Sequence, residues 1–424
     1  MNRRALHLAG NLAGLVGGLV TAPLTARALG PDGRGHVAII VVIATVLMTA
    51  AALGLPWLAR ADLVHDPLAL SFWRRQARNV GLVLIPVGAA IGWLAASVSG
   101  LRGAEVPAAV TVVVLAVLAA ARGIEGNALI SGGRPDLYGL ASIVASLFTI
   151  TTVVVAFLWG VLDVALVLWT TAGSAVLQIT LTVLFVERSI RGRRAALAAR
   201  ERELRARPDY RGRSLVSRAG RAWGSQVGEA FGSRGDTLAA VASGTTAAVG
   251  LYSVVALVPQ VAYAIYTTVV QTAYSRHREG DSLERFRHVF QGCTAISIAL
   301  ALVAWPVAWW GVPVIFGAEF TPAREFIVPA LLMTVALGAF APVIQHLSEG
   351  RLSVLPLAGV LALAGTAAAL GAVLGGPSVA ISCLAGAMFA GSLAYAVWRT
   401  RGAVFRVTAT RTLRWWRGEV NPDA

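Results

Sequence analysis

The chain has 424 residues, of which 57% are hydrophobic and only 13% are charged. Soluble globular proteins average about 45–50% apolar and about 25% charged residues, so the composition excludes an ordinary soluble enzyme, and its apolar content excludes a disordered chain. A polytopic membrane protein remains. The formal net charge is +15. Basic loops on the cytoplasmic side are typical of membrane proteins, so we expect no nucleic-acid partner.

Twelve apolar segments are long enough to cross a bilayer as helices. The seventh is the least apolar, because it carries three ionisable residues. Arg3 and Arg4 resemble the start of a signal peptide, but apolar segments continue to residue 398, so we expect an uncleaved first span. In chain order the predicted spans are 6–28, 37–59, 80–100, 107–129, 138–160, 164–186, 222–243, 249–272, 290–312, 326–347, 354–375 and 378–398.

The arginines indicate the topology. With both termini in the cytoplasm, 31 of the 36 basic residues fall on the cytoplasmic side of the cell membrane, as the positive-inside rule requires. Residues 193–207 are strong helix formers closed by Pro208, and we expect a basic helix at the lipid surface. The predicted domains are a six-helix lobe (1–187), a basic cytoplasmic linker (188–221), a second six-helix lobe (222–398) and a basic amphipathic tail (399–424).

The two predicted lobes share small motifs at equivalent positions. Gly33 precedes Gly250 by 217 residues, and each begins the second span of its half. Val106–Pro107 precedes Val328–Pro329 by 222 residues, and each pair opens a fourth span. Six spans per half give both halves the same orientation. The sequence therefore predicts an all-α membrane protein built as a 6+6 parallel repeat, an architecture typical of alternating-access transporters.

Ionisable residues inside spans are the candidate functional groups, because each is costly in a bilayer. Arg122 and Glu125 lie three residues apart on one face of the fourth span and are expected to pair, either for structure or for function. Glu229 and Asp236 share a face of the seventh span, with Arg234 beside Asp236. We interpret them as facing a cavity; the alternative is a half-buried entry loop.

Arg27 ends the first span. It is either an anchor that extends to the membrane interface or a guanidinium that faces the cleft and binds phosphate. Motifs for enzymatic chemistry are absent from the sequence: there is no lysine for a phosphate-binding loop and no paired-histidine metal motif. Cys293 and Cys383 stand in apolar runs and are interpreted as packing residues. We therefore expect neither catalysis nor a cofactor.

Four stretches resemble polysaccharide-type lipid flippases (Wzx-like proteins) of the multidrug/oligosaccharidyl-lipid/polysaccharide exporter superfamily. The segment 21–39 is similar to the end of the first span and the outer loop that follows it. The segment 233–258 is similar to the seventh and eighth spans, with an arginine–aspartate signature and the turn GLYS. The four stretches are TAPLTARALGPDGRGHVAI (21–39), ISGGRPDLYGLAS (130–142), SRGDTLAAVASGTTAAVGLYSVVALV (233–258) and WWGVPVIFGAEFTPA (309–323).

The resemblance implies a MATE-like transporter that moves a polyprenyl-pyrophosphate-linked glycan to the outer leaflet for cell-surface polysaccharide synthesis in a bacterium. By position, Arg27 and Arg234 resemble cavity arginines, with Asp236 as their acidic companion. A proton or sodium ion is the expected coupling ion, taken up by Glu229, Asp236 or the Arg122–Glu125 pair. Membrane lipid, the glycan substrate and glycan polymerases or glycosyltransferases are the expected partners. The alternatives are a cation-coupled multidrug exporter and a non-transporting scaffold for glycan enzymes.

Overall fold

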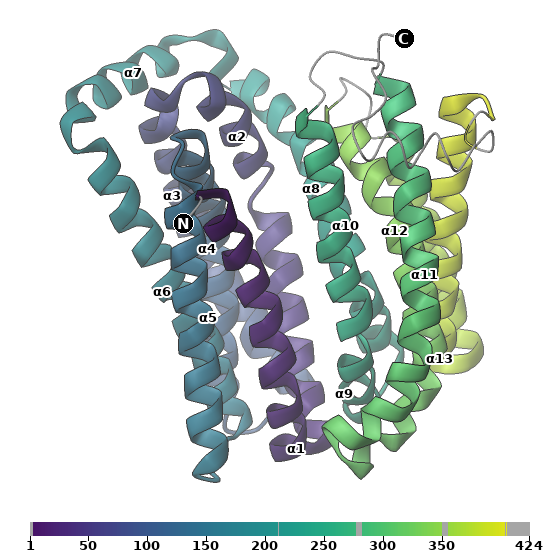
Figure 1. Cartoon of the computed structure of the whole chain (residues 1–424). Helices are drawn as coiled ribbons and strands as arrows, with labels where there is room; N and C mark the ends of the chain where they lie inside the picture. The colour runs from purple at the N-terminus through teal and green to yellow at the C-terminus, as the bar shows by residue number, and fades with distance from the viewer. Residues whose placement is uncertain (1–2, 211, 277–281, 350–354, 403, 405–424) are drawn as a thin grey trace. The chain divides into compact units, whose positions relative to one another are not determined.

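The computed structural model describes residues 3–210, 212–276, 282–349, 355–402 and 404, and they are helical apart from turns. Figure 1 shows the described residues as helices joined by turns. They are α1 (Arg3–Ala51), α2 (Leu55–His65), α3 (Leu70–Val98), α4 (Glu105–Ser131), α5 (Pro135–Leu158), α6 (Val164–Ile190), α7 (Arg194–Ala206), α8 (Gly212–Ser243), α9 (Thr246–Val255), α10 (Leu257–Arg276), α11 (Ser282–Phe316), α12 (Ile327–Glu349) and α13 (Leu355–Thr400). Short 3-10 helices cover Pro67–Ala69 (η1), Arg191–Arg193 (η2), Pro208–Tyr210 (η3) and Ala318–Phe326 (η4).

Glycine kinks divide two of these helices into pairs of spans. Within the described residues, eight helices are long and apolar enough to cross a membrane, or nine if α9 and α10, bent by 47°, form one span. In α1 the backbone of Gly30 is non-helical, and in α13 that of Gly375 and Gly376 is. Each of these helices therefore contains two spans. Counting α8, which is less apolar, gives the predicted twelve helices of a multi-pass membrane protein.

Two predicted boundaries were wrong. The second span ends at Ala51 instead of residue 59, because Leu53 and Gly54 adopt positive φ angles and turn the chain into the separate helix α2. The third span begins at Leu70 instead of residue 80. Its first turns carry Arg74, which looked like a loop residue but is neutralised by two carboxylates inside the helix bundle.

The chain divides into two compact units, unit 1 (Met1–Ala230) and unit 2 (Phe231–Ala424). The division falls within α8, later than the predicted linker. Residues 188–221 belong to unit 1, and the predicted helix forms at Arg194–Ala206. Most of the predicted basic tail, residues 405–424, lies outside the described part of the chain.

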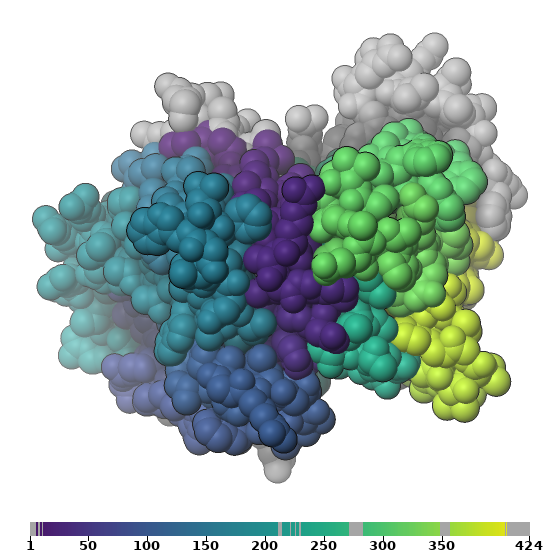
Figure 2. All heavy atoms as spheres, turned by 90° about the horizontal axis from the view of Figure 1, so that it is seen from below, coloured from purple at the N-terminus to yellow at the C-terminus, as the bar shows by residue number. Residues whose placement is uncertain are grey.

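In unit 1, α1 packs along α5 and α3 packs along α4. The first pair approaches closely at Gly10, where an added Cβ would lie 2.4 Å from the Cα of Gly139. α3 and α4 are antiparallel, because an added Cβ at Gly81, Gly88 and Gly92 would meet Val117, Val113 and Ala109 in turn. Viewed end-on, the purple α1 lies beside the blue and teal segments of unit 1 (Figure 2).

The turns of unit 1 collect at two ends, as an up-and-down bundle requires. One cavity of about 290 Å³ is lined by Pro67 from the turn before α3, Gly132 from the turn after α4 and Arg193 from the turn after α6. Leu101, in the turn between α3 and α4, packs in one apolar cluster with Leu168 near the start of α6. The turns predicted to be cytoplasmic thus share one end of unit 1.

Unit 2 has an aromatic core. Its α11, α12 and α13 pack side by side, and α10 packs on α12. Gly338 of α12 allows the close approach of α11, since an added Cβ would lie 2.5 Å from the side chain of Ser297. Tyr252, Tyr266, Phe286, Phe320, Phe326 and Phe340 are fully buried.

The predicted match between Pro107 and Pro329 has a structural counterpart. α4 begins at Glu105 and α12 begins at Ile327, so both prolines occupy the third helical position. A proline in the first helical turn removes no intrahelical hydrogen bond. The two fourth spans therefore start in the same way.

Candidate functional site

Two arginines lie on either side of the kink in α1. Gly30 adopts a φ of 64°, and Pro31 follows it. The guanidinium of Arg34 donates a hydrogen bond from Nη1 to Oγ1 of Thr25, 2.7 Å away, across the kink. Arg27 is exposed, whereas Thr25 is buried. The first span thus ends with Arg27 before the kink, and the second span begins with Arg34 after it.

Arg34 was assigned from the sequence to an outer loop. In the structure it lies in the second half of α1 and is only partly exposed. The Gly-Pro-Asp-Gly run before Arg34 is typical of a loop, which explains why the sequence placed Arg34 there. In the structure the run forms a kink between the two halves of α1, and Thr25 and Arg34 remain within hydrogen-bond distance across it.

The seventh segment, α8, supplies the candidates of unit 2. The carboxylate of Asp236 is only 1% exposed. It accepts a hydrogen bond from the Tyr252 hydroxyl of α9 at 2.6 Å and bonds from the backbone N–H and hydroxyl of Thr237 at 2.6 and 3.2 Å. Arg234 is partly exposed and interacts electrostatically with Asp236. The side chain of Glu229 lies outside the described part of the structure.

Tyr252 is the functional-site candidate that the sequence interpretation missed. It is fully buried and packs edge-on against Phe326, with ring centroids 5.8 Å apart. The run GLYS was recognised only as a turn. In the structure it lies within α9, and its tyrosine is the closest hydrogen-bond donor to Asp236 from another helix.

The predicted pair of Arg122 and Glu125 was wrong. Glu125 of α4 is 4% exposed and forms its salt bridge with Arg74 of α3, at 2.6 Å, instead of with Arg122 on its own helix. Arg74 also contacts Glu187 of α6 at 2.5 Å. A guanidinium on a neighbouring helix can bind a carboxylate through two parallel bonds.

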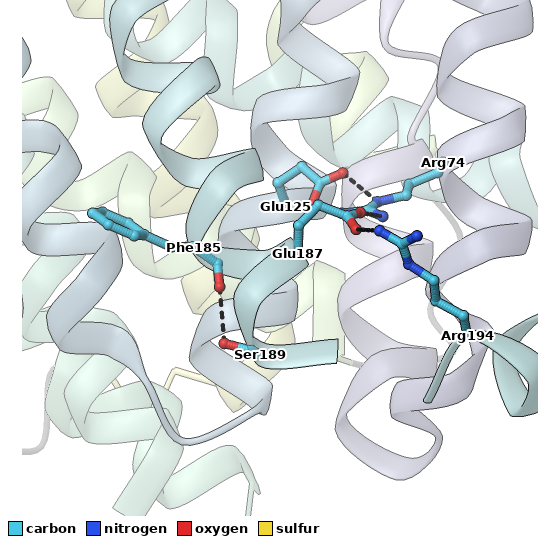
Figure 3. Close-up of polar contacts among 6 residues, drawn as sticks. All are labelled: Arg74, Glu125, Phe185, Glu187, Ser189 and Arg194. Atoms are coloured by element: carbon cyan, nitrogen blue, oxygen red, sulfur yellow. Dashed lines mark hydrogen bonds and ion pairs between the residues drawn. The ribbon is translucent and has the colours of Figure 1, made fainter. Parts of the chain in front are cut away.

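Figure 3 shows how Arg74 lies between the two carboxylates. The other oxygen of Glu187 contacts Arg194 of α7 at 3.2 Å. Four helices, α3, α4, α6 and α7, therefore meet in one network of alternating charges, Arg74, Glu125, Glu187 and Arg194. Arg74 gives the buried Glu125 two hydrogen bonds, and the more exposed Glu187 is contacted by both Arg74 and Arg194. The sequence did not indicate this network, because its residues come from segments that are far apart along the chain.

Helix α7 is docked on the rest of unit 1. Arg200 bonds to Asp66 at 2.6 Å, and the Ser71 hydroxyl donates to the carbonyl of Leu197 at 2.9 Å. Leu197 and Leu204 are buried in the core cluster beneath it. After α7, the Tyr210 hydroxyl donates to Asp62 at 2.8 Å. Burial and this hydrogen bond raise the pKa of Tyr210, so the phenol stays a donor at neutral pH.

Unit 2 contains a cluster of basic side chains. The ring of His346 lies 3.4 Å from Nε of Arg399 and stacks at 4.6 Å on the ring of Phe286. Arg285 is also buried there.

Gln178 donates to the Ser142 hydroxyl at 2.8 Å and so links α6 to α5. Within the described residues, no three His, Cys, Asp or Glu side chains are grouped as metal ligands. Cys293 and Cys383 are both free thiols.

No family model matches this chain, and no curated protein matches its sequence. Solved structures do match along almost its whole length. An inward-facing multidrug resistance MATE family transporter of the MOP superfamily has a TM-score of 0.55 and 14% identity, covering 96% of this chain and 97% of its own. A MATE transporter in the bent conformation has a TM-score of 0.54 and 15% identity, covering 98% and 95%.

A third match is a MOP superfamily transporter from Pyrococcus furiosus, described by the reverse polarity of its binding pocket. Its TM-score is 0.55 at 15% identity, covering 96% of this chain and 98% of its own. At such identities the matches show the fold. The chain has the fold of MATE transporters, and the predicted all-α, MATE-like class is confirmed.

Proposed function

We propose that this protein is a transporter that flips a polyprenyl-pyrophosphate-linked oligosaccharide or polysaccharide unit across the cell membrane by alternating access. The observation that supports this most is the arginine pair of α1. Arg27 and Arg34 flank the kink at Gly30, and Asp32 is the one carboxylate of that segment. A guanidinium binds phosphate through two bonds and stays charged, so a kink flanked by two arginines suits a pyrophosphate headgroup.

In this proposal the lipid tail stays in the bilayer while the glycan crosses a hydrated path. Arg27 and Arg234 are the residues proposed to neutralise the pyrophosphate. Asp236, or Glu229, takes up a coupling proton or sodium ion. Glu125 is held by Arg74 and does not form a coupling pair with Arg122.

A second candidate is a cation-coupled multidrug exporter. It is supported by the fold shared with a multidrug resistance MATE transporter and by the buried acid Asp236. The Pyrococcus furiosus transporter, for which pocket polarity is taken to indicate a different function, shows why the charge of the binding residues is the discriminating feature. A cation exporter is expected to bind through acids and aromatic rings, and a pyrophosphate flippase through arginines.

The test uses the full chain in proteoliposomes that contain a fluorescent polyprenyl-pyrophosphate disaccharide in one leaflet. Arg34→Ala and Arg27→Ala are compared with Arg102→Ala, an exposed arginine in the turn after α3. We expect flipping by the wild type and by Arg102→Ala, and at least a tenfold loss in the other two, because a charge-assisted bond to phosphate contributes about 1.5–3 kcal/mol.

Uptake of ethidium is measured in the same vesicles. Transport of ethidium without flipping of the glycan lipid would establish the multidrug exporter and reject the flippase. If Arg34→Ala and Arg27→Ala bind the glycan lipid as well as the wild type does, the role given to the α1 arginines is rejected. In cells, both substitutions should also lower surface glycan at unchanged protein level.

A further inference from the structure

A groove runs along unit 1 between α3, α4 and α6. Its volume is about 410 Å³, within the usual range of about 300–1,000 Å³ for ligand sites. Most of its lining is apolar and includes Leu82, Ile85, Val117 and Leu118. Leu82 and Ile85 are 60% and 44% exposed, so the groove is open on its α3 side.

One end of the groove is charged and the other is apolar. On α3, Arg74 and Arg78 precede Leu82 and Ile85. On the antiparallel α4, Glu125 follows Val117 and Leu118, so its charge falls at the same end. With a rise of 1.5 Å per residue, the apolar lining from Arg78 to Ile85 extends about 10 Å along α3.

Two arginines and two glutamates line the charged end, and Arg194 beside it adds one further positive charge. Arg74 is held between Glu125 and Glu187, at 2.6 and 2.5 Å. Arg78 is an additional cation, exposed at the rim. Arg194 of α7, whose side chain is 75% exposed, lies at the same end through its bond to Glu187. A ligand here meets arginine first and then a row of aliphatic side chains.

We propose that this groove binds an anionic membrane phospholipid. Its phosphate contacts Arg78, and one acyl chain lies along Leu82, Ile85 and Val117. The arginine-rich turns share this end of unit 1, and positive charge is typical of the cytoplasmic side, where anionic lipids are enriched. A bound chain would fill the space between α3, α4 and α6 next to the Arg74 network. The site does not depend on what the protein transports.

The test is photo-crosslinking of the purified full chain in nanodiscs. The probes are phosphatidylglycerol and phosphatidylcholine, each with a diazirine on one acyl chain. In the wild type we expect phosphatidylglycerol to label α3 or α4 at groove residues and to exceed phosphatidylcholine. Arg78→Gln should lower phosphatidylglycerol labelling about fivefold, the effect of about 1 kcal/mol for one basic residue near a lipid surface.

Arg75→Gln is the matched control, because Arg75 is the exposed arginine three positions before Arg78 and does not line the groove. It should leave labelling unchanged. Leu82→Trp, at a position exposed enough to tolerate a larger side chain, should block labelling by both lipids. Equal labelling by the two lipids in the wild type, or no change in Arg78→Gln, overturns the proposal. Displacement of phosphatidylglycerol by an equimolar amount of polyprenyl phosphate also overturns it, since the groove would then be a substrate site.

Discussion

The guanidinium of Arg74 donates two parallel hydrogen bonds to the carboxylate of Glu125, from Nε at 2.6 Å and from Nη2 at 2.8 Å. The pair joins α3 to α4 where Glu125 is nearly inaccessible. Removing one partner of a buried ion pair costs about 3–5 kcal/mol, because the other charge stays buried without compensation.

We therefore expect Arg74→Met to lower the free energy of unfolding of unit 1 by about that amount. The measurement is denaturant unfolding in detergent micelles. Arg75→Met is the control and should be nearly neutral, since Arg75 is 46% exposed and lies 3.9 Å from Glu201. The double variant Arg74→Met/Glu125→Leu should recover part of the loss. A single variant as stable as the wild type would contradict a structural role for the pair.

The contact between Gly10 and Gly139 predicts opposite effects of alanine at two glycines of α1. Gly10→Ala should destabilise unit 1 by about 1–3 kcal/mol, the usual cost of overpacking, because the new methyl group meets the backbone of α5. Gly14→Ala should stabilise the helix by up to about 1 kcal/mol, since the structure has nothing within 4 Å of that position. Thermal unfolding in micelles measures both; equal effects would show that α1 and α5 do not approach at Gly10.

The docking of α7 depends on the bond between Arg200 and Asp66. Asp66→Arg should expose the α7 backbone, because it replaces attraction by repulsion beside the buried Leu197. Hydrogen–deuterium exchange of residues 194–206 is the measurement, and faster exchange is expected. The charge swap Asp66→Arg/Arg200→Asp should restore protection, while Arg202→Asp on the exposed face should leave it unchanged. Slow exchange in Asp66→Arg would mean that the apolar contacts alone hold the helix.

The Tyr252 hydroxyl is expected to stabilise unit 2 through Asp236. Tyr252→Phe removes a donor to a buried carboxylate, and hydrogen bonds to charged groups contribute about 1.5–3 kcal/mol. The same substitution in an Asp236→Leu background should cost less, because the acceptor is already gone. Chemical unfolding of the four proteins gives the coupling energy, and a coupling of zero would remove Tyr252 from the candidate site.

The topology can be tested by cysteine labelling in intact cells. In a variant with Cys293 and Cys383 replaced by serine, a cysteine at Arg102 should react with a membrane-impermeant maleimide added outside. A cysteine at Arg202 should react only after permeabilisation, because α7 is predicted to be cytoplasmic. Labelling of position 202 in intact cells would reverse the predicted orientation.

The spans were predictable because a bilayer requires long apolar helices, and because Gly and Pro mark where they break. Gly30 and Gly376 separate spans that otherwise form continuous helices. The error at the start of α3 has one physical cause. Arg74 looked incompatible with a span, and only the neighbouring helices contain the carboxylates that neutralise it.

The sequence by itself determined the membrane class, the number of spans and the arginine asymmetry, since these follow from composition and from the order of residues along the chain. Tertiary structure alone decided which charges are paired. Arg74, Glu125, Glu187 and Arg194 come from four helices, and Tyr252 reaches Asp236 from the next helix. Electrostatic partners are selected by distance in space, and separation along the chain does not specify that distance.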